Sequence, residues 1–445
     1  APWLALRRGD IDSRSGRLDS ATKAFDEAVT GFRLSGNLHA VAEVQRAAGM
    51  NHLMSGSSEL AEAALNEALA ASLELDDTRN EAWARQNLAW LGFVQGRIGK
   101  AEERIAKATA LFTQLGDEIG VSWSRGLLAY VRMHQGLFDE AEELAEASLA
   151  DSVGRNDRWG EGMMLVLLGS IELWRGNTLS AVRLGRQSVA LFREINDLFG
   201  LIQGESVLGR ALIRSGRVDE GFAVLTEAQS VLPEGDDGIG QLARATLATS
   251  QVSVGRPELA LERLGHTVSK EIDPSLIGQS EWVVALGLAL LQDGRLDEAR
   301  EVLEYAARAM SDVGQDAAAV AALALVVASD GDLERSDELL LSILASSRTT
   351  YLDRLRTYIA HGLAKAAAGA SDAAEDSFVA ARVLLDPTGD QLALAVLSLA
   401  QAMSASHLGL PTASTIEAEA DDRLRELGIA ATGWRQAFAA ILSKA

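Results

Sequence analysis

The chain has 445 residues, a formal net charge of −22 at pH 7 and no cysteine. Without cysteine it can form neither a disulfide nor a thiolate metal site, which fits a cytoplasmic protein. The negative charge argues against nucleic-acid binding by this segment, because a phosphate-binding surface needs the opposite sign. We expect no membrane span, since the longest apolar stretch, at 317–328, is too short and too rich in alanine.

A glycine recurs along the whole chain at intervals of 37 to 40 residues. The residue seven positions earlier is always Gly or Ala, and the residue five positions later is always Ala, Gly or Ser. Such a period is typical of a solenoid of repeated helix pairs, in which small residues allow two helices to approach closely. We expect each glycine to adopt φ > 0 at the turn between two helices. These glycines are Gly16, Gly56, Gly96, Gly136, Gly176, Gly216, Gly255, Gly294, Gly331, Gly369 and Gly409.

A second turn lies half a period away from the first. Its first residue suits the left-handed C-cap of a helix, and its second residue, Asn or Asp, suits the N-cap of the next helix. The pairs are Gly36-Asn37, Asp76-Asp77, Gly116-Asp117, Asn156-Asp157, Asn196-Asp197 and Asp236-Asp237. Each unit therefore contains two helices, one ending at the recurrent glycine and one beginning there.

Between these turns the apolar residues fall at helical spacing, as they do from Ile98 to Phe112, and no runs typical of strands occur. We predict an all-α chain of about eleven helix pairs over residues 1–428. Residues 429–445, with Trp434, Phe438 and Ile441, are expected to form a C-terminal capping helix. Because the chain starts without Met and inside a helix, we expect the first repeat to be truncated and an upstream segment to be missing.

Two stretches carry a family resemblance. Gly16, Ala21, Phe25 and Ala28 share their spacing with the residues from Gly56 to Leu69, and this pattern resembles the tetratricopeptide repeat (TPR). The 40-residue unit departs from the usual length. Long repeat units that end in a sequence such as residues 115–120 resemble those in the TPR sensor regions of bacterial signal-transduction ATPases and of LuxR-family, maltose-activator-like transcription regulators. The resemblance implies a right-handed superhelix whose first helices line a concave groove.

If the first helices line a groove in this way, aromatic and methionine side chains gather at groove positions of neighbouring repeats. Large apolar side chains facing a groove would suit an apolar peptide, an amphipathic helix or a small molecule. Alternatively, the same rings bridge consecutive repeats as part of the core. The candidate groove residues are Met50, Met54, Trp83, Trp90, Phe93, Trp123, Tyr130, Met133, Met163 and Trp174, and Trp159 is expected at the edge of this patch.

Arg210 and Arg214 share a helix face beyond this patch. They are candidates for contact with an anion or an acidic peptide, and the alternative is pairing with nearby acidic helices. No phosphate-binding loop, metal-ligand motif or convergent acid, base and nucleophile is recognisable, so we expect no cofactor, no metal and no catalysis by this segment.

These observations lead to one functional hypothesis and one alternative. We expect a sensor and scaffold region of a multidomain bacterial regulator, which binds an effector peptide, protein or small molecule and contacts an upstream switch domain. The alternative is a freestanding TPR adaptor that scaffolds a protein complex.

Overall fold

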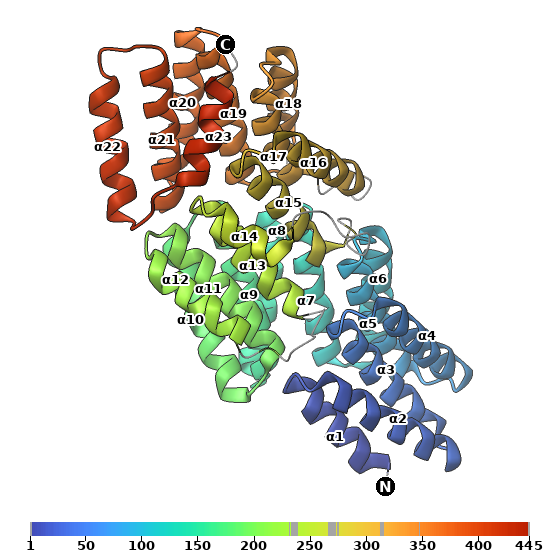
Figure 1. The fold of residues 1–445 in the computed structure, drawn as a ribbon. Coiled ribbons are helices and arrows are strands. Elements are labelled where there is room, and N and C mark those ends of the chain that lie inside the picture. The colour runs from blue at the N-terminus through green and yellow to red at the C-terminus, as the bar shows by residue number, and fades with distance from the viewer. Residues whose placement is uncertain are drawn as a thin grey trace. The chain divides into compact units, whose positions relative to one another are not determined.

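The computed structural model describes residues 2–230, 232, 239–265, 273, 276–311, 316–346 and 348–443. These residues form 23 helices and no strand, which confirms the all-α prediction (Figure 1). The count equals eleven pairs and one additional helix. The predicted turn at 236–237 lies outside the described residues.

The helices follow the predicted alternation along the chain. The odd-numbered helices are the first members of their pairs: α1 Pro2–Arg14, α3 Leu38–Met54, α5 Thr78–Val94, α7 Glu118–His134, α9 Arg158–Arg175, α11 Leu198–Arg214, α13 Ile239–Ser253, α15 Ile277–Gln292, α17 Ala317–Ala328, α19 Tyr351–Ala367 and α21 Gln391–His407. The even-numbered helices are the second members: α2 Leu18–Leu34, α4 Ser58–Glu74, α6 Ile98–Leu115, α8 Phe138–Gly154, α10 Thr178–Ile195, α12 Val218–Ser230, α14 Pro257–Leu264, α16 Leu296–Ser311, α18 Leu333–Ala345, α20 Ser371–Leu385 and α22 Ala413–Glu426. The last helix is α23 Thr432–Leu442.

Both predicted turns are confirmed. All eleven recurrent glycines have positive φ, between 64° and 91°, which L side chains rarely adopt. At the second turn, the N-cap side chain accepts a hydrogen bond from the backbone N–H three residues later, at 2.8–3.2 Å. This cap satisfies one of the unpaired donors at the start of the next helix. The five N-cap residues are Asn37, Asp77, Asp117, Asp157 and Asp197.

The small residue before each turn has a packing role. At six of these positions the residue is glycine, and at five of the six an added Cβ would lie within 2.8 Å of a bulky side chain sixteen residues later. The pairs are Gly9 with Phe25, Gly49 with Leu65, Gly209 with Leu225, Gly287 with Leu303 and Gly362 with Phe378. A bulky side chain of the second helix therefore lies directly against the backbone of the first. We describe the chain as a TPR-like array because these turns and contacts recur.

The chain divides into two compact units. Unit 1 comprises residues 1–168, 184–205 and 227–243, and unit 2 comprises 169–183, 206–226 and 244–445. Within unit 1, Leu198 at the start of α11 covers Gly16 and joins a cluster with Met54 and Ile202. These contacts join residues more than 140 positions apart in the chain.

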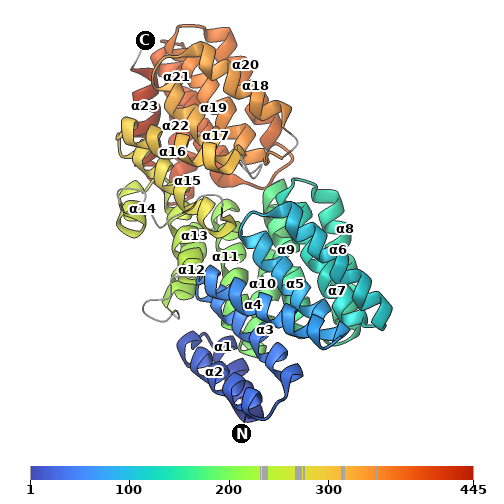
Figure 2. The same cartoon turned by 90° about the vertical axis from the view of Figure 1, so that its right-hand side faces the viewer.

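Unit 2 also contains contacts between distant repeats. Helix α23 packs against α15, α17, α19 and α21 (Figure 2). The Trp434 Nε1–H donates to the carbonyl oxygen of Ser253 at 2.9 Å, and the Gly433 N–H donates to the carbonyl oxygen of Gly255 at 3.0 Å. The C-terminal segment of this unit therefore lies against a glycine turn from the middle of the chain. The boundary at residue 428 between array and capping helix stays a prediction.

Candidate functional site

Unit 1 brings together aromatic rings from three consecutive first helices. The ring centroids of Trp83 on α5 and Trp123 on α7 are 5.8 Å apart, and Trp123 stacks on Trp159 of α9 at 4.8 Å. A second row joins Trp90 to Tyr130 at 5.6 Å, and Phe93 lies 6.2 Å from the same tyrosine ring. We call the six residues of these two rows the aromatic face: Trp83, Trp90, Phe93, Trp123, Tyr130 and Trp159.

The exposure of these rings divides the predicted residues into two groups. Phe93 and Tyr130 are 4% and 7% exposed, and Met133 and Met163 are also buried. These four side chains pack between repeats. The four tryptophans of the aromatic face are half-buried, so parts of their rings remain accessible. Accessible surface for a ligand is therefore concentrated on the tryptophans.

Hydrogen bonds hold these rings in fixed orientations. The Trp123 Nε1–H donates to Asp157 Oδ2 at 2.8 Å, while Asp157 Oδ1 caps α9. Trp159 donates in the same way to Asp197, the N-cap of α11. The Tyr130 hydroxyl donates to the carbonyl oxygen of Met163 at 3.2 Å. A surface whose side chains are already ordered loses less conformational entropy when it binds.

Arg46 on α3 is a residue of this region that the sequence interpretation missed. Its guanidinium carbon lies 5.7 Å from the centroid of the Trp83 ring, within the range of a cation–π contact. Its Nε is buried and has no hydrogen-bond acceptor among the described residues. Burial lowers the pKa of Arg46, and the charges of Glu43 and Asp10 oppose that shift. Its position four residues before Met50, on the same helix face, was a signal that could have identified it.

Other residues complete the surroundings of the aromatic face. Phe112 on α6 is fully buried and meets the Trp83 ring edge-on at 4.8 Å. His134 lies 5.0 Å from Phe93, and burial lowers the pKa of this histidine to about 4, so it is neutral at pH 7. Met50 and Met54 are half-buried, and Met54 packs against the start of α11. Trp174 is half-buried and belongs to unit 2, so unit 1 does not bring it together with the others.

The two candidate anion-binding arginines have partners inside unit 2. Arg210 Nη2 lies 2.5 Å from Glu281 Oε1. Arg214 Nη1 donates to Asp390 Oδ2 at 2.8 Å and to the Tyr351 hydroxyl at 3.2 Å. Burial disfavours the charge of Arg214, but Tyr351 and Asp390 together raise its pKa. Both guanidinium groups therefore neutralise internal carboxylates, the arrangement named above as the alternative to an anion site.

A serine, a histidine and an aspartate also meet in unit 2, on α20, α19 and α18. His361 Nδ1 is 2.7 Å from Ser377 Oγ, and its Nε2 is 2.7 Å from Asp337 Oδ1. Ser377 is 5% exposed and donates to the carbonyl oxygen of Ala373, whereas the Asp337 side chain is 46% exposed. A hydrolase triad needs an accessible nucleophile and a buried carboxylate. Here the serine is buried and the aspartate is exposed, which is the opposite arrangement. The hydrogen bonds between these residues connect three helices.

No three His, Cys, Asp or Glu side chains in the described ranges are grouped so that they could hold a metal ion. No helix in the described part of the chain is long and apolar enough to cross a membrane.

Comparison with known proteins identifies no family for this chain. No protein-family profile and no curated protein sequence matches it. Among solved structures, it is similar to the apo form of the quorum sensor NprR from B. thuringiensis, with 10% identity and a TM-score of 0.49 over 77% of this chain and 98% of that chain. A Rap protein complexed with competence and sporulation factor gives 13% identity and a TM-score of 0.44 over 87% of this chain and 98% of that one.

A third similar structure is the signal-transduction ATPase with a tetratricopeptide repeat sensor, PH0952, from Pyrococcus horikoshii. It has 14% identity and a TM-score of 0.38, over 82% of this chain and 52% of that chain. The chain thus spans about half the length of that ATPase. At such identities the likeness concerns the fold alone, and the site is argued from its own geometry.

Proposed function

We propose that this chain is a non-catalytic binding region and that its aromatic face takes up an effector. The observation that carries the proposal is the set of four half-buried tryptophans on neighbouring first helices. Aromatic rings with fixed orientation and partial exposure supply large contact areas at low entropic cost. A core that needed only apolar volume would be served by side chains without accessible ring surface, such as Phe112.

The effector class that suits this surface is a peptide or protein segment with apolar side chains, or a small apolar molecule. The exposed ring surfaces lie on α5, α7 and α9, so one ligand could contact more than one repeat. Arg46 adds a cation beside Trp83 that could receive an acidic group of the ligand. With a net charge of −22, the chain is a poor partner for nucleic acid, and we propose none.

Within a longer protein we propose that this region is the sensor and scaffold part of a multidomain bacterial regulator in the cytoplasm. An effector that contacts several repeats would favour one arrangement of the helices. It would control an attached switch domain if its affinity differs between the two states of that domain.

Peptide selection tests the binding proposal directly. A random peptide library is selected on the wild-type chain, and the affinities of the recovered peptides are measured for Trp83→Ala and Trp123→Ala. We expect apolar and aromatic residues in these peptides and a loss of roughly thirtyfold for each variant, as for a residue central to an interface. Trp3→Ala is the matched control, because Trp3 is 48% exposed on α1, outside the aromatic face.

Circular dichroism of every variant checks that helicity is retained. Peptides that bind both aromatic-face variants as tightly as the wild type would remove this surface from the proposal. The wider role is tested in the full-length protein: a selected peptide should change nucleotide hydrolysis or transcription in a reporter strain, and Trp123→Ala should abolish the response. A full-length protein that responds normally with Trp123→Ala would contradict the sensor role.

A further inference from the structure

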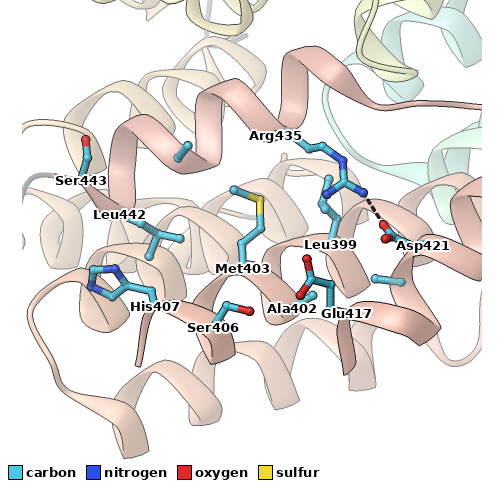
Figure 3. Close-up of a pocket in the computed structure, with 12 residues that line it drawn as sticks. Leu399, Ala402, Met403, Ser406, His407, Glu417, Asp421, Arg435, Leu442 and Ser443 are labelled. Atoms are coloured by element: carbon cyan, nitrogen blue, oxygen red, sulfur yellow. Dashed lines mark hydrogen bonds and ion pairs between the residues drawn. The ribbon is translucent and has the colours of Figure 1, made fainter. Parts of the chain in front are cut away.

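Unit 2 contains a hollow of about 330 Å³ between α21, α22 and α23 (Figure 3). Its walls are mostly apolar, and Met403 projects into it from α21. At one end Arg435 and Asp421 form an ion pair, and His407 lies near Leu442 at the other end. The volume is at the lower end of the range for ligand pockets, about 300–1,000 Å³. It is therefore large enough for a compact organic molecule.

The repeat pattern explains why this hollow exists. In six other second helices, a bulky side chain that is at most 3% exposed stands three residues before a buried alanine. Helix α22 has a buried alanine, Ala420, and a buried Leu424 four residues later, but the residue three positions before Ala420 is the exposed Glu417. No bulky side chain fills this place in α22, and the exposed Glu417 lines the hollow. The residues at this position elsewhere include Phe25, Leu65, Ile105, Leu303 and Phe378.

The charges of the lining are unequal. Asp421 is engaged by Arg435, whereas the Glu417 carboxylate has no hydrogen bond or ion pair with any of the described residues. An exposed carboxylate beside an apolar cavity attracts a cation, and it favours one whose remaining atoms are apolar. An anion would meet an uncompensated negative charge at the same place.

We propose that this hollow binds a compact hydrophobic amine. The apolar body of the ligand lies against Met403, Leu399 and Leu442, and its ammonium group donates hydrogen bonds to Glu417. The flexible thioether of Met403 adapts to the shape of the apolar body. The site lies in unit 2, whereas the aromatic face lies in unit 1.

Methyl NMR of the whole chain tests this site. The chain has seven methionines, so methyl-¹³C-methionine labelling gives few signals. The Met403→Leu variant assigns the methyl signal of Met403, because that signal is missing from its spectrum. The probes are phenethylamine, 2-phenylethanol and 3-phenylpropanoate, which share a ring and differ in charge. We expect phenethylamine to shift the Met403 signal saturably, with a Kd on the order of 1 mM for so small a ligand. The alcohol should bind about tenfold more weakly, and the carboxylate should not bind.

Two pairs of variants separate the contributions of charge and space. Glu417→Gln should weaken amine binding about tenfold and leave alcohol binding unchanged, because only the charge-assisted hydrogen bond is lost. Glu419→Gln, on the same helix but outside the lining, is its control. Ala439→Leu should fill the hollow from an exposed position of α23 and abolish binding of both probes, while Ala440→Leu should not.

Three results would overturn the proposal. The first is a Met403 signal that phenethylamine does not move, and the second is equal affinity for amine and alcohol. The third is a movement of all methionine signals together, which would indicate non-specific binding. The first two outcomes would not bear on the aromatic face, since that region is monitored separately by Met50, Met54, Met133 and Met163.

Discussion

Glu205 on α11 supplies a test of the electrostatics of unit 1. Its side chain is 1% exposed, and Oε1 accepts a hydrogen bond from Arg193 Nη2 at 2.8 Å. Its Oε2 is buried and has no partner among the described residues. Arg193 also pairs with Glu227, whose negative charge faces the same site. Burial raises the pKa of Glu205 from 4.5 to about 7, although the contact with Arg193 opposes that shift.

The sign of the pH dependence follows from this shift. Between pH 4.5 and about 7, the folded state retains a proton on Glu205 that the unfolded state has released. The contribution of this group to stability is therefore lost as the pH rises through that window. The full shift corresponds to about 3 kcal/mol of unfolding free energy. Glu205→Gln, which is neutral at every pH, should stabilise the protein by about 2 kcal/mol at pH 8 and have little effect at pH 4.5.

Urea unfolding, followed by circular dichroism from about pH 4.5 to 8.5, measures this difference. The matched control is Glu227→Gln, because Glu227 contacts the same arginine but its side chain is 58% exposed. We expect its effect to be small at every pH, as for other exposed ion pairs. If the stability difference between Glu205→Gln and the wild type is the same at all pH values, Glu205 does not titrate in this window and the reasoning is wrong.

Three further substitutions test packing, capping and buried charge, each by urea unfolding. Phe112→Ala should cost about 3–5 kcal/mol because it leaves a cavity beneath Trp83, and a cost below about 1 kcal/mol would show that the site is loosely packed. Asp157→Ala should cost about 1–2 kcal/mol, since it removes both the cap of α9 and the acceptor of the Trp123 indole, and an unchanged tryptophan fluorescence spectrum would contradict the second effect. Asp390→Ala should cost about 3–5 kcal/mol because Arg214 stays buried without its counter-charge, and a neutral effect would mean that this arginine reaches solvent.

The repeat architecture could be predicted from the sequence because its determinants are local. A positive φ at Gly16 or Gly56 depends only on the turn in which the glycine stands. The cap of α9 likewise depends on Asp157 and the next three residues. Such features recur in every unit, so the period of about 40 residues makes them visible in one sequence.

Contacts between distant repeats could not be predicted from such local patterns. Arg214 and Asp390 are 176 positions apart, and no local pattern indicates that they meet. The same is true of Leu198 and Gly16. For the aromatic residues, the repeat frame predicted which helix carries each one. It did not predict how deeply each ring is buried, because burial depends on the rotation of a helix about its axis. A small rotation of α7 would be enough to make the buried Tyr130 ring accessible.

The period also sets the extent of the aromatic face. A residue 40 positions later occupies the same place on the next first helix, so Trp83 lies beside Trp123 and Trp90 beside Tyr130. Glu43 stands 40 positions before Trp83, and the buried Met163 stands 40 positions after Trp123, so Trp159 completes this row on α9. With about 10 Å between packed helices, three helices span roughly 20 Å. An extended peptide covers that length with about six residues. Selected peptides longer than this should therefore gain no further affinity from the aromatic face, and truncation experiments would measure that limit.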